Sequence, residues 1–173
     1  MTVDQANDAG YIAQTTTVEK DPYKATTSYV AKALYNEMGS RVFLRATAFD
    51  DQEAEDPSVM QLYFGLRNNG WMFPHSVYIA GDRYDVTKIG SDVNCASYGC
   101  TNYEDVGLSI TGEQLEAWSK TGVSLKVAGK AGEQVFTINP GYISGFRSVV
   151  YGLPAPEVQI PEDATVSSVQ PTG

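Results

Sequence analysis

The sequence predicts a mainly β protein: an antiparallel β-sandwich or curled sheet of about seven strands with two short helices. Two observations lead to this prediction. Apolar residues alternate with polar ones in most segments between residues 41 and 138, which is the period of a half-buried strand. Short glycine-containing turns separate several of these segments, so neighbouring strands are expected to pair as hairpins. The length of 173 residues suits a single domain.

The alternating segments begin with residues 41–49 and 60–66, which place every second side chain on one face. Residues 76–80 and 83–89 flank Gly81-Asp82, and this pair indicates a tight hairpin because glycine accepts a positive φ. Three further segments continue the pattern, namely 106–110, 123–128 and 135–138. The last two are joined by a turn at 129–132, so we expect an antiparallel sheet built largely from hairpins.

Two short helices interrupt the strands. The first begins at a capping box, in which the side chains of Thr111 and Gln114 satisfy each other's main-chain N–H groups, and Gly122 can end it. The second begins at Asn139 and Pro140, because proline at the first helical position costs no hydrogen bond. Each helix is expected to cover a sheet end.

The second helix contains a glycine, and a third helical segment is predicted before the strand at 41–49. Gly145 weakens the second helix but is expected to let it approach a sheet closely. Residues 30–39 are predicted to form a third short helix.

The two ends of the chain are predicted to be flexible. Residues 1–24 are polar and lack a period, apart from a short edge strand at 15–18, and several prolines punctuate the segment from 152 onward. We therefore expect a flexible arm over 1–24, one β-rich domain over 25–151 and a Pro-rich tail over 152–173. Such an arm would suit a tether between the domain and a lipid anchor that is missing from this chain.

The chain is acidic, with a formal net charge of −9. A protein of this charge repels nucleic-acid backbones and anionic membrane surfaces, so we predict no nucleic-acid partner. No stretch approaches about 18 consecutive apolar residues, which predicts no transmembrane segment. The charge is interpreted as a source of solubility, with a cationic partner or Ca²⁺ as the alternative.

The two cysteines suggest where the protein works. Cys95 and Cys100 are five positions apart with Gly99 between them, a spacing that suits a small loop closed by a disulfide. A redox Cys-x-x-Cys pair is tighter, and a zinc site needs further ligands. Because disulfides persist outside the reducing cytoplasm, we expect an extracytoplasmic protein, in the periplasm or on the cell surface. Two buried thiols are the alternative.

No residues match a catalytic or cofactor motif, so we predict no catalytic residue and no cofactor. His75, the only histidine, opens a predicted strand and is interpreted as structural. Glu104 alternates with Val106 and is expected to share its face. If Glu104 is buried, we expect it to pair with an arginine, for which the candidates are Arg41, Arg45 and Arg83. A hydrolase that uses Glu104 and a second carboxylate is the weaker alternative.

The acidic segment Asp50–Asp56 carries five carboxylates in seven residues. Ca²⁺ takes about six to eight oxygen ligands, but the spacing does not match an EF-hand. We interpret the segment as a solvated loop and predict no metal site.

Aromatic residues supply the candidate ligand-binding site. Tyr98 lies between the cysteines, Tyr103 follows them, and Trp71 follows Asn68-Asn69-Gly70. Exposed aromatic rings offer a large contact area at low entropic cost, for stacking on sugars or for a protein interface. Trp71, Tyr98 and Tyr103 are therefore the candidates, with ordinary cross-strand packing as the alternative.

Residues 41–150 resemble uncharacterised exported or lipoprotein-type domains of bacteria. The resemblance rests on Arg-Val-Phe-Leu-Arg at 41–45, the Cys-x4-Cys segment followed by Tyr-Glu at 103–104, Leu-Glu-Ala-Trp at 115–118, Thr-Gly-Val at 121–123, Gly-Lys-Ala-Gly-Glu at 129–133 and Pro-Gly-Tyr-Ile-Ser-Gly-Phe at 140–146. It implies an extracytoplasmic location and a β-rich fold, and it implies no activity.

These observations predict an exported envelope or surface domain without catalytic activity that binds a protein or a cell-wall partner. A small-ligand or glycan-binding module is the alternative. A flat apolar patch would favour a protein partner, whereas a concave pocket with converging polar groups would favour a small ligand.

Overall fold

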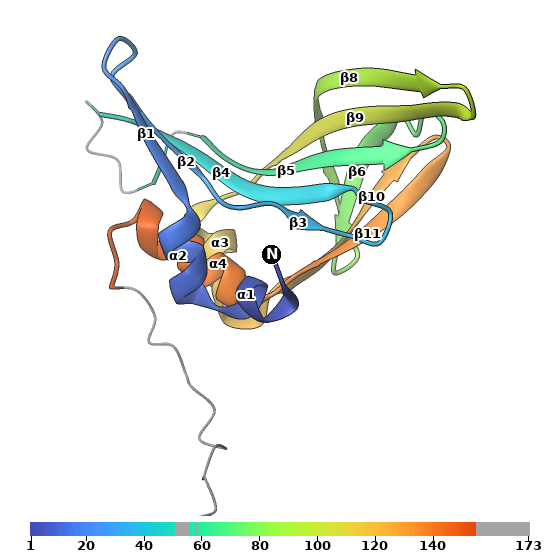
Figure 1. Ribbon diagram of the computed structural model, residues 1–173. Helices are drawn as coiled ribbons and strands as arrows, with labels where there is room; N and C mark the ends of the chain where they lie inside the picture. Colours follow the sequence, from blue (N-terminus) through green and yellow to red (C-terminus); the bar gives the residue numbers. More distant parts are fainter. Residues whose placement is uncertain (51–55, 58, 155–173) are drawn as a thin grey trace, which may run out of the picture.

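The computed structural model describes residues 1–50, 56–57 and 59–154. Two antiparallel sheets and four helices make up this part of the chain (Figure 1). The predicted mainly β class is therefore confirmed. The Pro-rich tail from 155 onward, residues 51–55 of the acidic loop and residue 58 lie outside the described residues.

The larger sheet has the strand order β1-β2-β4-β5-β9-β8, with the short strand β3 also paired to β4. Alternation in this sheet is as predicted, because Val42, Leu44 and Ala46 of β4 are buried on its inner face. The strands are β1 (Thr17–Asp21), β2 (Thr26–Val30), β3 (Leu34–Tyr35), β4 (Arg41–Phe49), β5 (Val59–Asn68), β8 (Thr87–Ala96) and β9 (Gly99–Ser109).

The smaller sheet has the order β11-β10-β6-β7. Its strands are β6 (Pro74–Ile79), β7 (Asp82–Asp85), β10 (Val123–Gly129) and β11 (Gly132–Ile138). The β6–β7 hairpin turns at Ala80-Gly81, one residue earlier than predicted, with φ of 50° and 91° at these residues. The rings of Phe64 in β5 and Phe136 in β11 lie 5.4 Å apart, so the core joins the two sheets.

Figure 1 shows the helices below one part of the larger sheet and the strands of the smaller sheet toward its other end. Helix α3 (Gly112–Thr121) begins at the predicted capping box and ends at Gly122, where φ is 70°. Helix α4 (Pro140–Val150) begins after Asn139, whose side chain makes no capping hydrogen bond. Both predicted helices are confirmed.

The N-terminal residues pack against α4. Residues 1–24 contain α1 (Val3–Asn7), α2 (Ala9–Thr15) and β1, and Ile12 is completely buried. The close approach expected for Gly145 is made to α2 and not to a sheet, since a Cβ there would lie 2.4 Å from the carbonyl oxygen of Ala9. Helices this short are marginal alone and depend on such tertiary contacts, which is why the sequence pattern does not reveal them.

Two further segments differ from the predictions. Residues 30–39 are not helical: they contain β3 and a turn in which the Asn36 side chain accepts hydrogen bonds from the N–H groups of Met38 and Ser40. The predicted strand 83–89 divides at Val86, so that β7 joins the smaller sheet and β8 the larger. The residues around the cysteines, expected to be a loop, extend β8 and β9 into one long hairpin.

Candidate functional site

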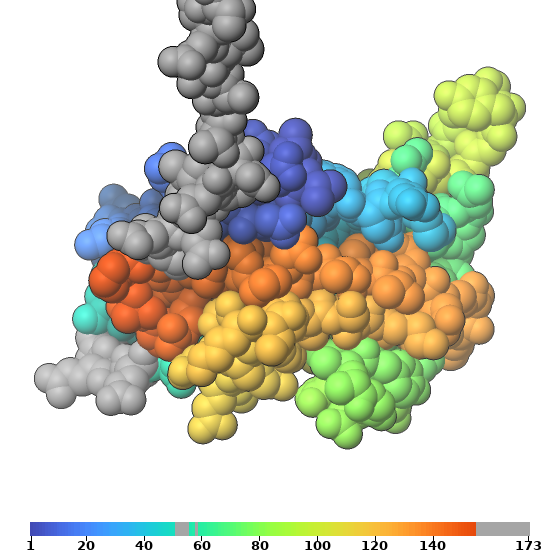
Figure 2. Space-filling view, turned by 90° about the horizontal axis from the view of Figure 1, so that it is seen from below, coloured from blue at the N-terminus to red at the C-terminus, as the bar shows by residue number. Residues whose placement is uncertain are grey.

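The β8–β9 hairpin carries two of the candidate binding residues. Cys95 and Cys100 face each other across the two strands and form the predicted disulfide, with their Cα atoms 4.0 Å apart. This cross-link holds together the end of a hairpin that would otherwise fray. In Figure 2 the hairpin tip, coloured yellow-green, stands out from the body of the molecule. Tyr98 lies at this tip and is 94% exposed.

A polar hollow of about 580 Å³ lies beside the hairpin, on the outer face of the larger sheet. Tyr103 of β9 pairs directly with Arg67 of β5, and both line the hollow together with Tyr98. Asn69 and Asn94 add side-chain amides to the same lining. Residues with phenol, guanidinium and amide side chains thus line one concave surface, a composition that suits a ligand rich in hydroxyl or charged groups.

Trp71 does not line this hollow. Its ring packs against Phe73, with the ring centroids 6.5 Å apart, in the connection between β5 and β6. The structure therefore separates Trp71 from Tyr98 and Tyr103. Arg67 was not among the predicted residues, because its place opposite Tyr103 depends on the register between β5 and β9, and alternation within one strand carries no information about that register.

Buried polar contacts hold the backbone of Arg67. Its N–H donates to Ser40 Oγ at 2.7 Å, and its carbonyl accepts from Gln134 Nε2 at 3.4 Å. Gln134 belongs to β11 and also bonds the side chains of Asn68 at 2.9 Å and Asn36 at 3.0 Å. This buried amide therefore ties the smaller sheet to the strand end that carries Arg67, and a satisfied polar network of this kind rigidifies its surroundings.

Glu104 is buried on the inner face of the larger sheet, beside Val106 as predicted. Its two oxygens accept hydrogen bonds from the N–H groups of Met72 at 2.7 Å and Phe73 at 3.0 Å. The expected ion pair with Arg41, Arg45 or Arg83 is wrong, because main-chain amides supply the donors instead. Phe73 has a φ of 53°, a costly conformation for a residue with a side chain, and the bonds from Glu104 help to hold it.

A second cavity, of about 250 Å³, lies on the inner side of the same hairpin. Its lining includes Phe73, His75, Lys88 and Glu104. His75 is the second residue of β6, one position after the strand begins at Pro74, and its Nδ1 lies 3.0 Å from Ser76 Oγ. Ser76 is completely buried, so its hydroxyl is not presented as a nucleophile, and both oxygens of Glu104 already accept a main-chain N–H. These contacts assign Ser76, His75 and Glu104 to structure.

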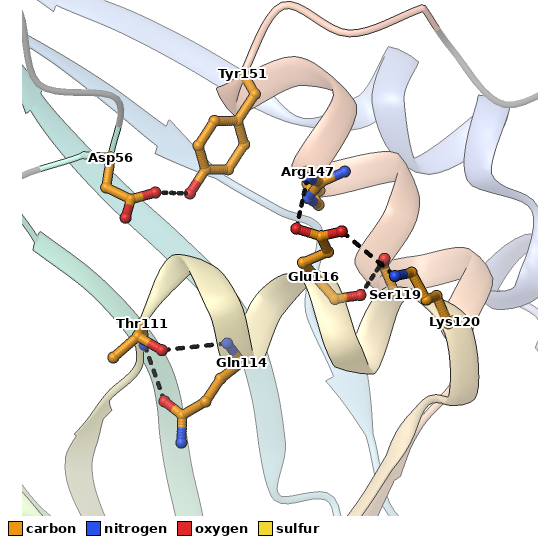
Figure 3. Close-up of polar contacts among 8 residues, drawn as sticks. All are labelled: Asp56, Thr111, Gln114, Glu116, Ser119, Lys120, Arg147 and Tyr151. Carbon is orange, nitrogen blue, oxygen red and sulfur yellow. Dashed lines mark hydrogen bonds and ion pairs between the residues drawn. The ribbon is translucent and has the colours of Figure 1, made fainter.

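A polar cluster at the ends of α3 and α4 is drawn in Figure 3. Tyr151 donates a hydrogen bond to Asp56, and burial together with this bond raises the pKa of the Tyr151 phenol. Glu116 contacts both Arg147 at 3.5 Å and Lys120 at 3.3 Å. The charged groups in this cluster pair with one another and join α3 to α4, which indicates a role in packing.

Comparisons with protein-family models, with curated proteins and with solved structures found no match to this chain. Within the described ranges, no group of three or more His, Cys, Asp and Glu side chains is placed to hold a metal ion. No helix in the same ranges is long and apolar enough to cross a bilayer. The chemistry of the outer hollow is therefore the best guide to function.

Replacing Glu104 by glutamine should lower the free energy of unfolding by about 1–3 kcal/mol. The amide keeps one acceptor oxygen but turns an NH₂ group toward one of the two main-chain N–H groups. Urea unfolding of the purified wild-type and variant chains measures the change in the free energy of unfolding. Glu133→Gln is the matched control, because Glu133 is exposed and paired only with Lys126 at the surface, so its loss should cost little. Equal stability of the two variants would show that Glu104 does not hold the connection.

Proposed function

We propose that this protein is an extracytoplasmic module without catalytic activity that binds a glycan of the cell envelope. The observation that carries the proposal is that Tyr98, Tyr103 and Arg67 line one hollow at the end of a cross-linked hairpin. Tyr103 and Asn94 lie on paired strands that hold their backbone in place, so little backbone entropy is lost there when a ligand binds.

The character of the hollow favours a glycan over a protein partner. Binding hot spots between proteins lie in well-packed, desolvated pockets, whereas this hollow is lined mainly by polar atoms and opens to solvent. Asn69 and Asn94 offer both donors and acceptors, which sugar hydroxyls can use in either direction. The ring of Tyr98 is free to stack, since almost all of its surface is exposed.

The disulfide supports the proposed location. Cys95 and Cys100 are both bonded, and disulfides persist mainly in oxidising compartments such as the periplasm or the cell surface. Attachment of the domain to the envelope through a lipid anchor remains part of this proposal.

Tyr98→Ala should weaken binding to a glycan that occupies the hollow by about tenfold, because the stacking ring is lost. The thermal stability of the Tyr98→Ala variant should equal that of the wild-type chain, because the Tyr98 side chain is exposed. Titration calorimetry with oligomers of N-acetylglucosamine, a neutral β-glucan and oligogalacturonate measures the affinity. Tyr23→Ala is the matched control, because Tyr23 is 98% exposed but lies at the turn between β1 and β2. If both variants bind each oligomer as well as the wild-type chain, the hollow is not the glycan site.

Protein isolated from its native cell should contain no free thiol. Alkylation before and after reduction, followed by mass spectrometry, counts the reactive cysteines at positions 95 and 100. Labelling only after reduction supports an extracytoplasmic location, because the disulfide then exists in the cell. Labelling of both cysteines without reduction contradicts that location.

A further inference from the structure

We propose that the glycan bound here is acidic, and that a row of three arginines on the outer face of the larger sheet holds its anionic groups. The row consists of Arg45, Arg41 and Arg67. This inference rests on the proposed function and specifies the class of ligand, a glycan that carries carboxylates or phosphates along its length.

Three arginines of this acidic protein lie together on the outer face of the larger sheet. Within the described ranges none of them has a carboxylate oxygen within 4.0 Å of its guanidinium nitrogens, whereas Arg83 and Arg147 do. The net charge of the whole chain is −9, so three neighbouring arginines without such partners are unusual on its surface. Such a surface attracts anions and orients them as they approach.

Aromatic stacking holds two of the guanidinium groups in place. Arg45 lies 4.8 Å from the ring of Tyr63 and donates to Gln61 Oε1 through Nε at 3.1 Å and Nη2 at 2.6 Å. Arg41 lies 5.9 Å from the Tyr63 ring and 6.0 Å from the Phe43 ring. Because a guanidinium has more donors than Gln61 uses, the remaining N–H groups stay available for a carboxylate or phosphate.

Four carboxylates of the described strands share this face: Asp105 and Asp92, and on β1 also Glu19 and Asp21, which the register through β2 places on the same side as Arg45. Asp105 lies close to Arg41, because an added Cβ on Gly65 would be 3.1 Å from Asp105 Oδ1 and 2.6 Å from Arg41 Nε. Burial, together with the nearby Asp105, raises the pKa of the Tyr63 phenol. Asp92 accepts a hydrogen bond from the N–H of Val93 at 2.8 Å. Asp105 therefore weakens the field of Arg41, and we expect Arg67 and Arg45 to contribute most to anion binding.

The geometry of the row sets the length of the ligand. Arg45 pairs with Gln61 of β5, which is six residues before Arg67 on the same strand, so the row extends for about 20 Å. A single sugar in the hollow reaches Arg67 alone. An oligosaccharide that leaves the hollow along β5 passes Arg41 and then Arg45, so affinity should rise with chain length until this distance is spanned.

The test is titration calorimetry of the full chain with oligogalacturonate as the probe. We expect an oligogalacturonate longer than about 20 Å to bind at least tenfold more tightly than a galacturonate trimer. Its affinity should exceed by the same factor that of a neutral malto-oligosaccharide of equal length. Binding should weaken as salt is raised. A phosphorylated mannan oligosaccharide, compared at equal length, distinguishes phosphate from carboxylate as the preferred anion. Oligoglutamate binding more tightly than either acidic glycan would overturn the proposal in favour of a peptide ligand.

Three variants locate the anion contacts. Arg67→Gln and Arg45→Gln should each reduce affinity for long oligogalacturonate about tenfold, whereas the control Arg83→Gln, on β7, should leave it unchanged. Circular dichroism and thermal unfolding check that all three remain folded. Equal affinities for neutral and acidic oligomers, or equal effects of Arg67→Gln and Arg83→Gln, would overturn the inference. If Tyr98→Ala still weakened glycan binding about tenfold in that case, the proposed function would stand without this inference. Absence of binding to every glycan would overturn both.

Discussion

The rest of the structure depends on how the chain passes from the larger sheet to the smaller one. β5 ends at Asn68 and β6 begins at Pro74, and between them the N–H groups of Met72 and Phe73 are bound by the two oxygens of Glu104. A buried carboxylate requires donors, and two main-chain amides that face it satisfy this requirement without a second buried charge. The same two bonds hold a strained residue in the connection and tie it to β9, the strand whose outer face carries Tyr103.

The two faces of the larger sheet differ in what their side chains contact. On the inner face, Glu104 and Gln134 use polar groups to join the sheets, and apolar side chains fill the remaining space. On the outer face, arginine and aromatic side chains are supported by paired strands and by one another but are not covered by another layer. Supports beneath a binding surface keep its side chains in position, which is why we propose recognition for the outer face and a structural role for the inner one.

How much the sequence predicts depends on whether a feature is local. The alternation of β4, the capping box of α3 and the disulfide all follow from neighbouring residues, and all three are confirmed. Glu104 was placed on the correct face by alternation, but its partners were missed because they are main-chain groups brought near by the crossing between sheets. Tyr98 was a candidate because of its position between the cysteines. Arg67 is not predicted as a site residue, because it lies opposite Tyr103 only when β5 and β9 pair in this particular register. That register depends on two segments that are far apart in the sequence.

The most direct test of this account is to map the ligand on the molecule by recording ¹⁵N–¹H spectra of the full chain during titration with long oligogalacturonate. The account predicts shifts at residues 67–69, at 94 and at 98–103, which surround the outer hollow, and smaller shifts along β4 beside Arg41 and Arg45. Shifts concentrated at Phe73, His75 and residue 130, on the inner cavity, would contradict the assignment of recognition to the outer face.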